Sequence, residues 1–290
     1  MLYVVATPIG NLGDISPRAL EVLENCDLIA AEDTRHTQKL LSHFDIKKPL
    51  VSYYEHNKVA RGPLLIEKLH SGENIALVSD AGTPGISDPG ADLIKAATDE
   101  GLEVSMIPGP VAGIMALVLS GLPTDKFVFE GFIGTDNKKK QEFADMIIEE
   151  MRTVIIYEAP HRLLKTLEFL QQHIGDRRVA VCRELTKTHE EVLRGTATEH
   201  ISHFTQIEPR GEFVLVIEGA DKKTSRSHNE EATADDIFNK FNELSDKYAS
   251  EGIRRKKNDI IKEVAAFFNI PKNQAYDMYE TVNQQTQGGL

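Results

Sequence analysis

Short apolar runs alternate with amphipathic stretches through the first 120 residues. Five runs rich in β-branched residues predict strands, and they read LYVVA, DLIAA, LVSYY, NIALVS and EVSMI from residues 2, 27, 50, 74 and 103. The helical stretch 16–25 has Ser16 where an N-cap is expected and Pro17 at its first position, and a second helix is predicted to open at Thr34. Strands that alternate with helices form a mostly parallel sheet covered by helices, so this half is predicted to be α/β.

The segment 111–121, VAGIMALVLSG, is apolar on every side and predicts a buried helix. Gly121 and Pro123 then interrupt the pattern before a new strand begins, which indicates a domain boundary. Further strands are predicted at 153–158, 178–184, 190–195 and 211–219, with helices at 159–173 and 196–204. Because some of these strands follow one another without a helix between them, the second sheet is expected to be mixed.

The composition changes again after Gly219. Residues 220–235 are polar and lack an apolar period, so they predict a linker. Three helical patterns follow, at 234–249, 259–269 and 271–284. The predicted fold class is therefore α/β with two domains, 1–121 and 122–220, and a C-terminal region, 221–290, that holds the linker and a small helical extension.

The charge and the cysteine content limit the partners and the cellular compartment that are expected for this protein. The net charge is −12, from 45 acidic and 33 basic residues, which argues against a broad nucleic-acid surface but not against a local one. Basic residues cluster at 138–140, 177–178 and 254–257, and each cluster by itself is more simply a solvated face. Cys26 and Cys182 lie far apart without metal-ligand spacing, which favours a reducing cytoplasm and no metal. The N-terminus predicts a strand rather than a signal peptide, and the longest apolar run is too short to span a membrane.

Three loops follow predicted strands, where open α/β sheets bind ligands. They are TPIGNLGD at 7–14, SDAGTPGISDPG at 79–90 and PGPVAG at 108–113. Neither the dinucleotide fingerprint GxGxxG nor the phosphate loop GxxxxGK[ST] is present. The second loop is longer than most strand-to-helix connections, and its glycines leave the backbone open to a ligand. A ligand with a carboxylate and an adenosine but no phosphate suits these loops.

Five further segments accompany these loops, namely AEDTRHTQKLL, SGLPTDKFVFEGF, YEAPHRLLKTL, RELTKTHEEVLRGT and RGEFVLVIEG. The order and spacing of the loops and these segments resembles the tetrapyrrole methylase family. Within that family the chain is similar to the branch that methylates a cytidine ribose 2′-hydroxyl of bacterial 16S ribosomal RNA. The resemblance covers roughly residues 2–219, and Val111 departs from it because serine is expected there. It implies a two-domain tetrapyrrole-methylase-like fold, a homodimer, and 16S rRNA of the small ribosomal subunit as the partner.

The resemblance also implies that S-adenosylmethionine lies between the two domains, on the loop that begins at Ser79. The expected cofactor-binding residues are Pro8, Ile9, Asp80, Gly82, Thr83, Pro84, Val111, Ala112, Tyr157 and Glu158. Asp80 can accept a hydrogen bond or offset the charge of the ligand, although an Asx-turn within its own loop is the alternative. For Tyr157 the alternative is a buried hydrogen bond, and Asp88 is more simply part of a turn.

Methyl transfer to a hydroxyl depends on placement of the reactants and on removal of the hydroxyl proton. The candidate catalytic residues are Lys187 with a lowered pKa, Glu184 and Glu32. Candidate RNA-binding residues are Arg35, Arg162 and Arg183, with 254–257 as a clamp. Arg162 is a lone cation at a predicted helix start, where an anionic partner offsets its unfavourable interaction with the helix dipole. Two other functions stay open, namely methylation of a tetrapyrrole or other small molecule, and non-catalytic RNA binding in assembly.

Overall fold

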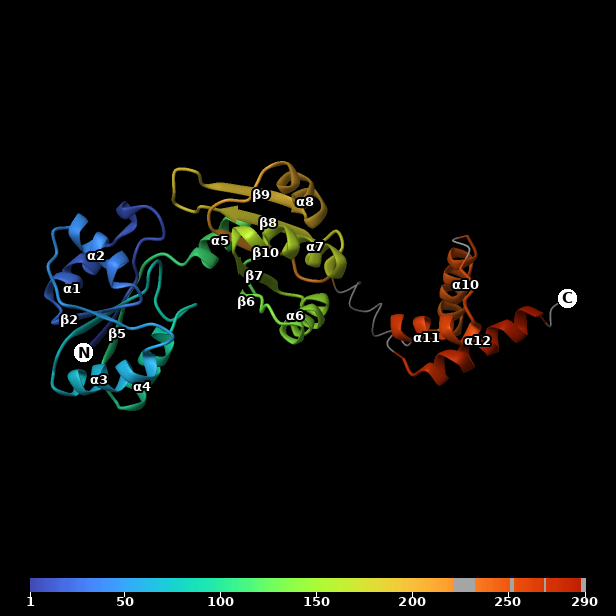
Figure 1. Ribbon diagram of the computed structural model, residues 1–290, viewed down its shortest axis with the longest axis horizontal. Helices are drawn as coiled ribbons and strands as arrows, with labels where there is room; N and C mark the ends of the chain where they lie inside the picture. Colours follow the sequence, from blue (N-terminus) through green and yellow to red (C-terminus); the bar gives the residue numbers. More distant parts are fainter. Residues whose placement is uncertain (222–232, 251–252, 269, 288–290) are drawn as a thin grey trace. The chain divides into compact units, whose positions relative to one another are not determined.

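The computed structural model describes residues 1–221, 233–250, 253–268 and 270–287. They fall into two compact units, which we call the sheet unit, residues 1–220, and the helical unit, residues 221–290. Figure 1 shows both sheets within the sheet unit and three labelled helices in the helical unit. Each unit has a hydrophobic core of its own, so each is described by itself.

The first sheet contains five parallel strands in the order β3-β2-β4-β1-β5. These strands are β1 (Leu2–Val5), β2 (Leu28–Ala31), β3 (Leu50–Ser52), β4 (Ile75–Val78) and β5 (Val104–Ile107). Two helices, α1 (Pro17–Asn25) and α2 (Thr34–His43), pack on one face, and α3 (Lys58–His70) and α4 (Gly90–Asp99) pack on the other. The predicted parallel α/β arrangement is therefore confirmed, with the loops after β1, β2 and β4 at one edge of the sheet.

Local capping follows the sequence signals closely. The hydroxyl of Ser16 accepts a hydrogen bond from the N–H of Ala19 at 3.1 Å, as expected for the N-cap of α1. Helix α2 begins at Thr34, but its N-cap is Asp33, whose carboxylate accepts from the N–H of Arg35 at 2.8 Å.

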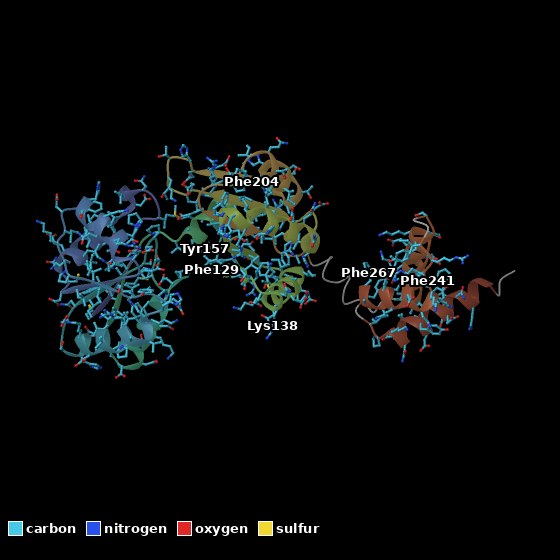
Figure 2. All side chains as sticks on the ribbon, in the orientation of Figure 1. Phe129, Lys138, Tyr157, Phe204, Phe241 and Phe267 are labelled. Atoms are coloured by element: carbon cyan, nitrogen blue, oxygen red, sulfur yellow. The ribbon has the colours of Figure 1, made fainter. Side chains whose placement is uncertain are left out.

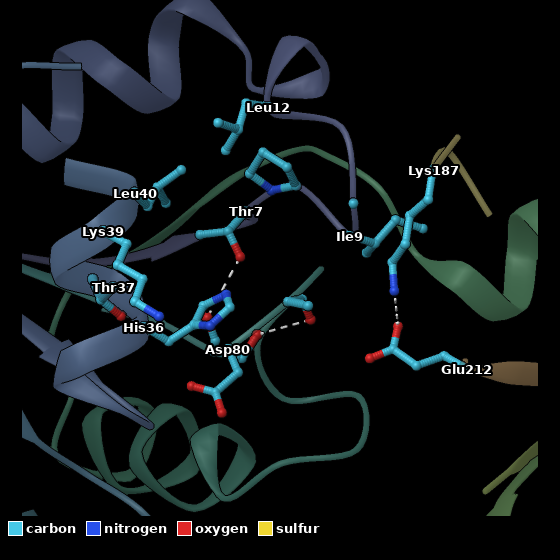
Figure 3. Close-up of a pocket in the computed structure, with 14 residues that line it drawn as sticks. Thr7, Ile9, Leu12, His36, Thr37, Lys39, Leu40, Asp80, Lys187 and Glu212 are labelled. Carbon is cyan, nitrogen blue, oxygen red and sulfur yellow. Dashed lines mark hydrogen bonds and ion pairs between the residues drawn. The ribbon is translucent and has the colours of Figure 1, made fainter. Parts of the chain in front are cut away.

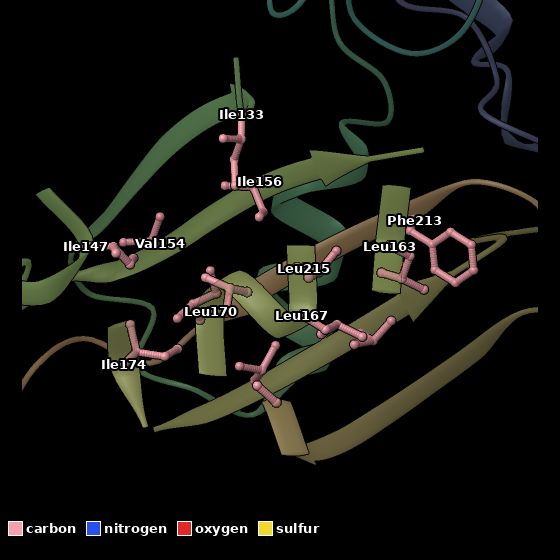
Figure 4. Packing of buried hydrophobic residues seen from close by; sticks show 14 of the residues in the cluster. Ile133, Ile147, Val154, Ile156, Leu163, Leu167, Leu170, Ile174, Phe213 and Leu215 are labelled. Carbon is pink, nitrogen blue, oxygen red and sulfur yellow. The ribbon is translucent and has the colours of Figure 1, made fainter. Parts of the chain in front are cut away.

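The second sheet is mixed, as predicted, with the order β6-β7-β10-β8-β9. Its strands are β6 (Phe127–Phe132), β7 (Thr153–Glu158), β8 (Arg178–Arg183), β9 (Glu191–Thr196) and β10 (Phe213–Ile217), and only β6 and β7 run parallel as neighbours. The 3-10 turn η2 (Pro160–Arg162) leads into α7 (Leu163–Ile174), which covers one face together with α6 (Asn137–Glu149) and α8 (Ala197–Gln206). Figure 4 shows the leucine and isoleucine side chains that fill this core.

Helix α5 (Ala112–Ser120) differs from its prediction in two ways. Its buried face, including Ala116 and Leu117, packs on the second sheet, although the expected domain boundary at 121 assigned it to the first. The opposite face is not buried, because Ile114 is 42% exposed and Val118 is 67% exposed. An apolar helix is buried only where it meets a complementary surface, and within residues 1–220 such a surface covers one side of α5 alone.

The basic pair 177–178 has a structural role. The guanidinium of Arg177 donates to the carbonyl oxygens of Ile147 at 2.6 Å and Glu218 at 2.8 Å, which ties the end of α6 to the end of β10. Arg178 forms an ion pair with the carboxylate of Glu218 at 2.6 Å. The basic cluster of Lys138 to Lys140, in contrast, is exposed on the first turn of α6.

The helical unit consists of α10 (Ala234–Ser250), α11 (Lys257–Phe267) and α12 (Lys272–Gln287). Its core is formed mainly by Ile237, Phe241, Ile260, Ile261, Val264 and Tyr279. The three predicted helices are confirmed, whereas residues 222–232 of the predicted linker lie outside the described residues.

Candidate ligand and active site

Two adjoining pockets open at the loop edge of the first sheet. The larger has a volume of about 440 Å³ and is lined chiefly by the loop of residues 79–88, so we call it the glycine-loop pocket. The smaller has a volume of about 310 Å³ and contains Lys187, so we call it the Lys187 pocket. Both pockets are lined by Ile9, Ser79, Asp80, Ala81 and Glu212. Glu212 precedes a strand of the second sheet, so both sheets contribute to the site.

The shape of the glycine-loop pocket depends on Gly82. This residue has φ +83°, and its N–H and carbonyl exchange backbone hydrogen bonds with Thr7 at 3.0 and 2.9 Å. A Cβ atom there would lie 3.1 Å from Cγ2 of Ile9, so both the backbone angle and the space favour glycine. Thr83 donates its hydroxyl to the carbonyl of Pro110 at 3.1 Å, which joins this loop to the one before α5.

Two residues of the same loop have structural positions. Asp88 accepts hydrogen bonds from the N–H groups of Gly85 and Gly90 at 2.9 and 2.8 Å, which confirms its expected role in a turn. Pro84 is buried and lines neither pocket, and its contact with the cofactor stays a prediction.

Two carboxylates form the acidic side of the glycine-loop pocket. Asp80 accepts a hydrogen bond from the N–H of Asp33 at 2.9 Å, and its own N–H donates to Glu32 at 3.2 Å. The hydrogen bond found for Asp80 therefore reaches the loop after β2, instead of closing an Asx-turn. Burial raises the pKa of Glu32, and the negative charge of Asp80 raises it further. This edge of the pocket is suited to a ligand with positive charge or hydroxyl groups.

The opposite wall of the glycine-loop pocket is apolar. It includes the expected residues Ile9, Val111, Ala112 and Tyr157, and also Phe132 and Val214, which the sequence did not single out. The hydroxyl of Tyr157 accepts from the N–H of Gly113 at 3.3 Å, so the alternative of a buried hydrogen bond is also realised. The ring packs edge-on against Phe129 and Phe132, with centroids 4.9 and 5.7 Å apart. Figure 2 labels Tyr157 and Phe129 within the sheet unit.

Glu158 and Arg162 interact with each other, and this changes the interpretation of both. The Glu158 side chain is 0% exposed; it accepts from the N–H of Ala159 at 2.7 Å and from the hydroxyl of Thr166. Arg162 lies 3.4 Å from that carboxylate and donates to the carbonyl of Ile133 at 2.7 Å. Glu158 lines the glycine-loop pocket although protein groups hold its carboxylate, and its contact with the cofactor stays a prediction. The argument for Arg162 as an RNA contact fails, since its anionic partner comes from within the chain.

Lys187 lies between two carboxylates in the smaller pocket. Its ammonium donates to Glu184 at 2.8 Å and to Glu212 at 2.9 Å, and Figure 3 shows it reaching toward Glu212. Burial lowers the pKa of Lys187, but the hydrogen bonds to the two carboxylates outweigh it, and the pKa is raised. The lowered pKa expected from the sequence is therefore wrong. The same contacts outweigh burial at Glu184 and lower the pKa of that carboxyl.

A close crossing of two loops brings Lys187 into this position. The N–H of Asn11 donates to the hydroxyl of Thr186 at 3.1 Å. A Cβ atom on Gly10 would lie 2.3 Å from Cγ of Lys187. The Lys187 side chain therefore occupies the space that the Cβ atom of any residue other than glycine would need at position 10. Glu184 and Thr186 have φ values of +49° and +67°, which is unfavourable for side chains and most of all for a β-branched one. The segment is therefore held in a strained conformation beside the pocket.

Helix α2 forms the other wall of the Lys187 pocket. Its contribution is His36, Thr37, Lys39 and Leu40, which Figure 3 shows opposite Lys187. The helical spacing of 36, 39 and 40 places them on one face, a signal that could have been used. Pro8 lines this pocket and not the glycine-loop pocket.

Two of the expected RNA-binding arginines lie outside both pockets. Arg35 is 88% exposed and paired with Asp33 at 2.7 Å. Arg183 donates to the carbonyl of Arg210 at 2.7 Å. Both stay predictions as RNA contacts, whereas neither is part of the walls of the site.

Across residues 1–221 and the described parts of the helical unit, no three histidine, cysteine or acidic side chains are grouped so that they could hold a metal ion. Among the helices that the structure describes, none is long and apolar enough to cross a membrane.

A parallel sheet and a mixed sheet whose loops meet around one ligand pocket define a two-sheet α/β protein. The chain belongs to the tetrapyrrole (corrin/porphyrin) methylase family, whose model matches residues 1–200. Methyltransferases of this family use S-adenosylmethionine as the methyl donor. The expected family and fold class are thereby confirmed.

The chain is also similar to curated relatives called ribosomal RNA small subunit methyltransferase I. The relative from Synechocystis sp. is 49% identical over 279 residues, which cover 96% of each chain. The relative from Bacillus subtilis is 45% identical over 282 residues, which cover 96% of this chain and 94% of that protein. A solved uroporphyrin-III-C-methyltransferase from Thermus thermophilus matches with a TM-score of 0.54 and 19% identity, over 79% of this chain and 97% of that one. The likeness to this structure shows the fold alone.

The glycine-loop pocket fits the methyl donor of the family. S-adenosylmethionine has a flat aromatic adenine that can stack on apolar side chains, ribose hydroxyls and a positively charged sulfur. The wall with Tyr157 and Phe132 offers an apolar surface, and the carboxylates of Asp80 and Glu32 offer hydrogen-bond acceptors and negative charge on the other side. Gly82 keeps the backbone between these two surfaces free of a side chain.

We expect Asp80→Asn to lower the affinity for S-adenosylmethionine about tenfold, the equivalent of about 1.4 kcal/mol. The affinity for S-adenosylhomocysteine should fall less, because its neutral sulfur gains nothing from the Asp80 charge. Calorimetric titration of both ligands measures the difference. Asp99→Asn, an exposed change on α4, is the matched control. Unchanged affinity for both ligands would remove Asp80 from the site.

We expect Gly10→Ala to push the Lys187 side chain out of its ion pairs, because the added Cβ overlaps Cγ of Lys187. Released from Glu184 and Glu212, Lys187 loses the contacts that raise its pKa and becomes more reactive toward an amine-acylating reagent. Peptide mass spectrometry after brief labelling measures this. Gly62→Ala is the control, since no atom lies within 4 Å of the added Cβ. Equal labelling in both variants would contradict the crossing geometry.

Proposed function

We propose that this protein transfers a methyl group from S-adenosylmethionine to a ribose 2′-hydroxyl of a cytidine in the 16S rRNA of the small ribosomal subunit. The main support is that the glycine-loop pocket adjoins a second pocket lined by Lys39 and Lys187, and that Asp80 lines both pockets. The relatives from Synechocystis and Bacillus subtilis, named as ribosomal RNA small subunit methyltransferases, support the choice of substrate. The cofactor supplies an activated methyl group on its sulfur.

The Lys187 pocket has the charges that a nucleotide requires. Lys187 and Lys39 come from opposite walls, so a phosphodiester can meet an ammonium group on both sides. In our proposal the ammonium of Lys187 donates a hydrogen bond to the 2′-oxygen and fixes the direction of its lone pair. Glu184 and Glu212 hold the lysine in its charged form, so it acts as a donor and not as a base.

We assign the proton of the 2′-hydroxyl to Glu32. Its raised pKa makes it a better acceptor than Glu184, whose pKa is lowered and whose Oε1 already accepts from Lys187 and from the N–H of Glu212. In the methyl-transfer step a bond forms between the 2′-oxygen and the methyl carbon, and the bond from sulfur to that carbon breaks. The proton of the hydroxyl moves to the Glu32 carboxylate. Placement in line contributes more than the base, because the sulfur is already a good leaving group.

The direct test is methyl transfer to purified small subunits from cells that lack this protein, followed by mapping of 2′-O-methylated positions. We expect one new ribose methylation on a cytidine of 16S rRNA. A porphyrinoid substrate offered in parallel tests the small-molecule alternative. Binding of the subunit without transfer of a methyl group would support a non-catalytic role instead.

The pH dependence of turnover tests Glu32. Because its pKa is raised above the ordinary glutamate value of 4.5, it becomes protonated earlier than an exposed glutamate as the pH falls. Turnover at saturating substrates should therefore rise with pH through that raised pKa. Glu32→Gln should lower the plateau roughly 100-fold and remove the acid limb. Glu184→Gln is the comparison, and if it removes the limb while Glu32→Gln leaves it in place, Glu184 is the proton acceptor.

We further propose that the protein is a homodimer that acts in the cytoplasm, where the ribosomal subunits are available. The exposed Ile114 and Val118 are four residues apart on α5 and form an apolar face that a second copy can cover. Val118→Asp should then give a monomer in sedimentation at micromolar concentration. Val59→Asp on α3, 85% exposed in this structure, should leave the dimer intact. A monomeric parent protein would overturn the proposal.

A further inference from the structure

Negative charge is distributed very unequally between the two units. Residues 1–220 contain 33 acidic and 22 basic residues, whereas residues 221–290 contain 12 and 11. The sheet unit therefore carries nearly all of the net charge of −12 and repels the RNA on which we propose that it acts. The nearly neutral helical unit carries no such penalty, and it lies beyond residues 1–200 that match the family.

The helical unit can present a surface of fixed shape because it has its own core. Phe241 is buried among α10, α11 and α12, together with Ile261, Val264 and Tyr279. Figure 2 labels Phe241 and Phe267 in this unit. Residues 253–256 connect α10 to α11 outside any helix, and the N–H of Ile253 donates to the carbonyl of Tyr248 at 2.9 Å.

The four consecutive cations of this connection are not equivalent. The guanidinium of Arg255 lies over the Tyr248 ring at 5.3 Å and 3.9 Å from the Glu263 carboxylate. The ammonium of Lys257 lies 4.5 Å from the centroid of the Tyr279 ring and pairs with Glu280. Residues 255 and 257 therefore hold the connection against the helices, through contacts with aromatic and acidic partners.

Arg254 and Lys256 occupy the alternate positions. Lys256 is the N-cap residue of α11 and has φ −76° and ψ 146°, the polyproline II conformation. Both residues are exposed, and neither has an ion pair within the described part of the chain. Two exposed cations next to the paired Arg255 and Lys257 thus remain free to bind an anion.

We propose that Arg254 and Lys256 form an RNA-contacting surface that holds the ribosomal RNA substrate through its phosphates while the sheet unit acts on it. This inference rests on the proposed function, which supplies the RNA. It changes the expectation for 254–257 from a uniform clamp to a pair of contacts, because Arg255 and Lys257 already have partners in the protein. The contacts are with phosphates, so they contribute affinity and salt dependence without base specificity.

The test compares two full-length double variants with the same change of charge. Arg254→Gln/Lys256→Gln removes the surface, and Lys138→Gln/Lys140→Gln removes two exposed lysines of α6. Binding to naked 16S rRNA is measured as a function of salt concentration. For the first variant we expect the slope of log affinity against log salt to fall by about 1.5 units, from two lost contacts. The second variant should keep the parent slope.

Turnover separates this inference from the proposed function. Affinity for S-adenosylmethionine and turnover at saturating RNA should match the parent protein in both double variants, because Arg254 and Lys256 belong to neither pocket. Arg254→Lys/Lys256→Arg should retain the slope, since it keeps both charges. A parent-like slope in Arg254→Gln/Lys256→Gln overturns the inference, as does a loss seen with whole subunits but not with naked rRNA. If the parent binds rRNA with the expected slope but transfers no methyl group, the proposed function fails and the RNA surface stands.

Discussion

The candidate site depends on the crossing of two loops that belong to different sheets. The loop after β1 has glycine at position 10, and the Lys187 side chain passes through the space that a Cβ atom would fill. The hydrogen bond from Asn11 to Thr186 fixes this crossing at a point where Thr186 has a left-handed backbone. This crossing brings Lys187 and Glu212 into the pocket that Asp80 also lines. The second sheet contributes to the ligand site because this contact is possible.

The charges of the two pockets follow from that arrangement. Asp80 and Glu32 face the glycine-loop pocket without a basic partner in contact, and burial raises the pKa of Glu32. In the neighbouring pocket Lys187 is held between two carboxylates, which keeps it charged. The two pockets therefore differ in charge, with two carboxylates at the glycine-loop pocket and a charged, paired lysine in its neighbour. Asp80 is one of the five residues that line both pockets, so the two charge environments meet there.

Helix α5 connects the site to the packing of the sheet unit. Its N-cap Val111 and its first residue Ala112 line the glycine-loop pocket, and its buried face packs on the second sheet. The helix thereby couples the loop before it, which contacts Thr83, to the core under β7, β8 and β10. Any movement between the sheets would change the width of the pocket, so the packing of Ala116 and Leu117 is also a constraint on ligand binding.

The sequence by itself determined the strands, the helices and the loops that carry the site, because these depend on short-range rules. These signals are local, because each involves residues that are close together in the sequence. They are the apolar periodicity, the N-cap Ser16, the turn that contains Asp88 and the glycines of 79–90. Tertiary structure alone decided which polar groups meet. The Glu158 carboxylate contacts Thr166 and Arg162, and Lys187 forms an ion pair with Glu212, which is 25 residues away. Pro84 is buried, and one face of α5 is exposed. Each of these outcomes depends on how separate strands and loops are placed side by side, and the pKa of a buried group follows from that placement and from no local pattern.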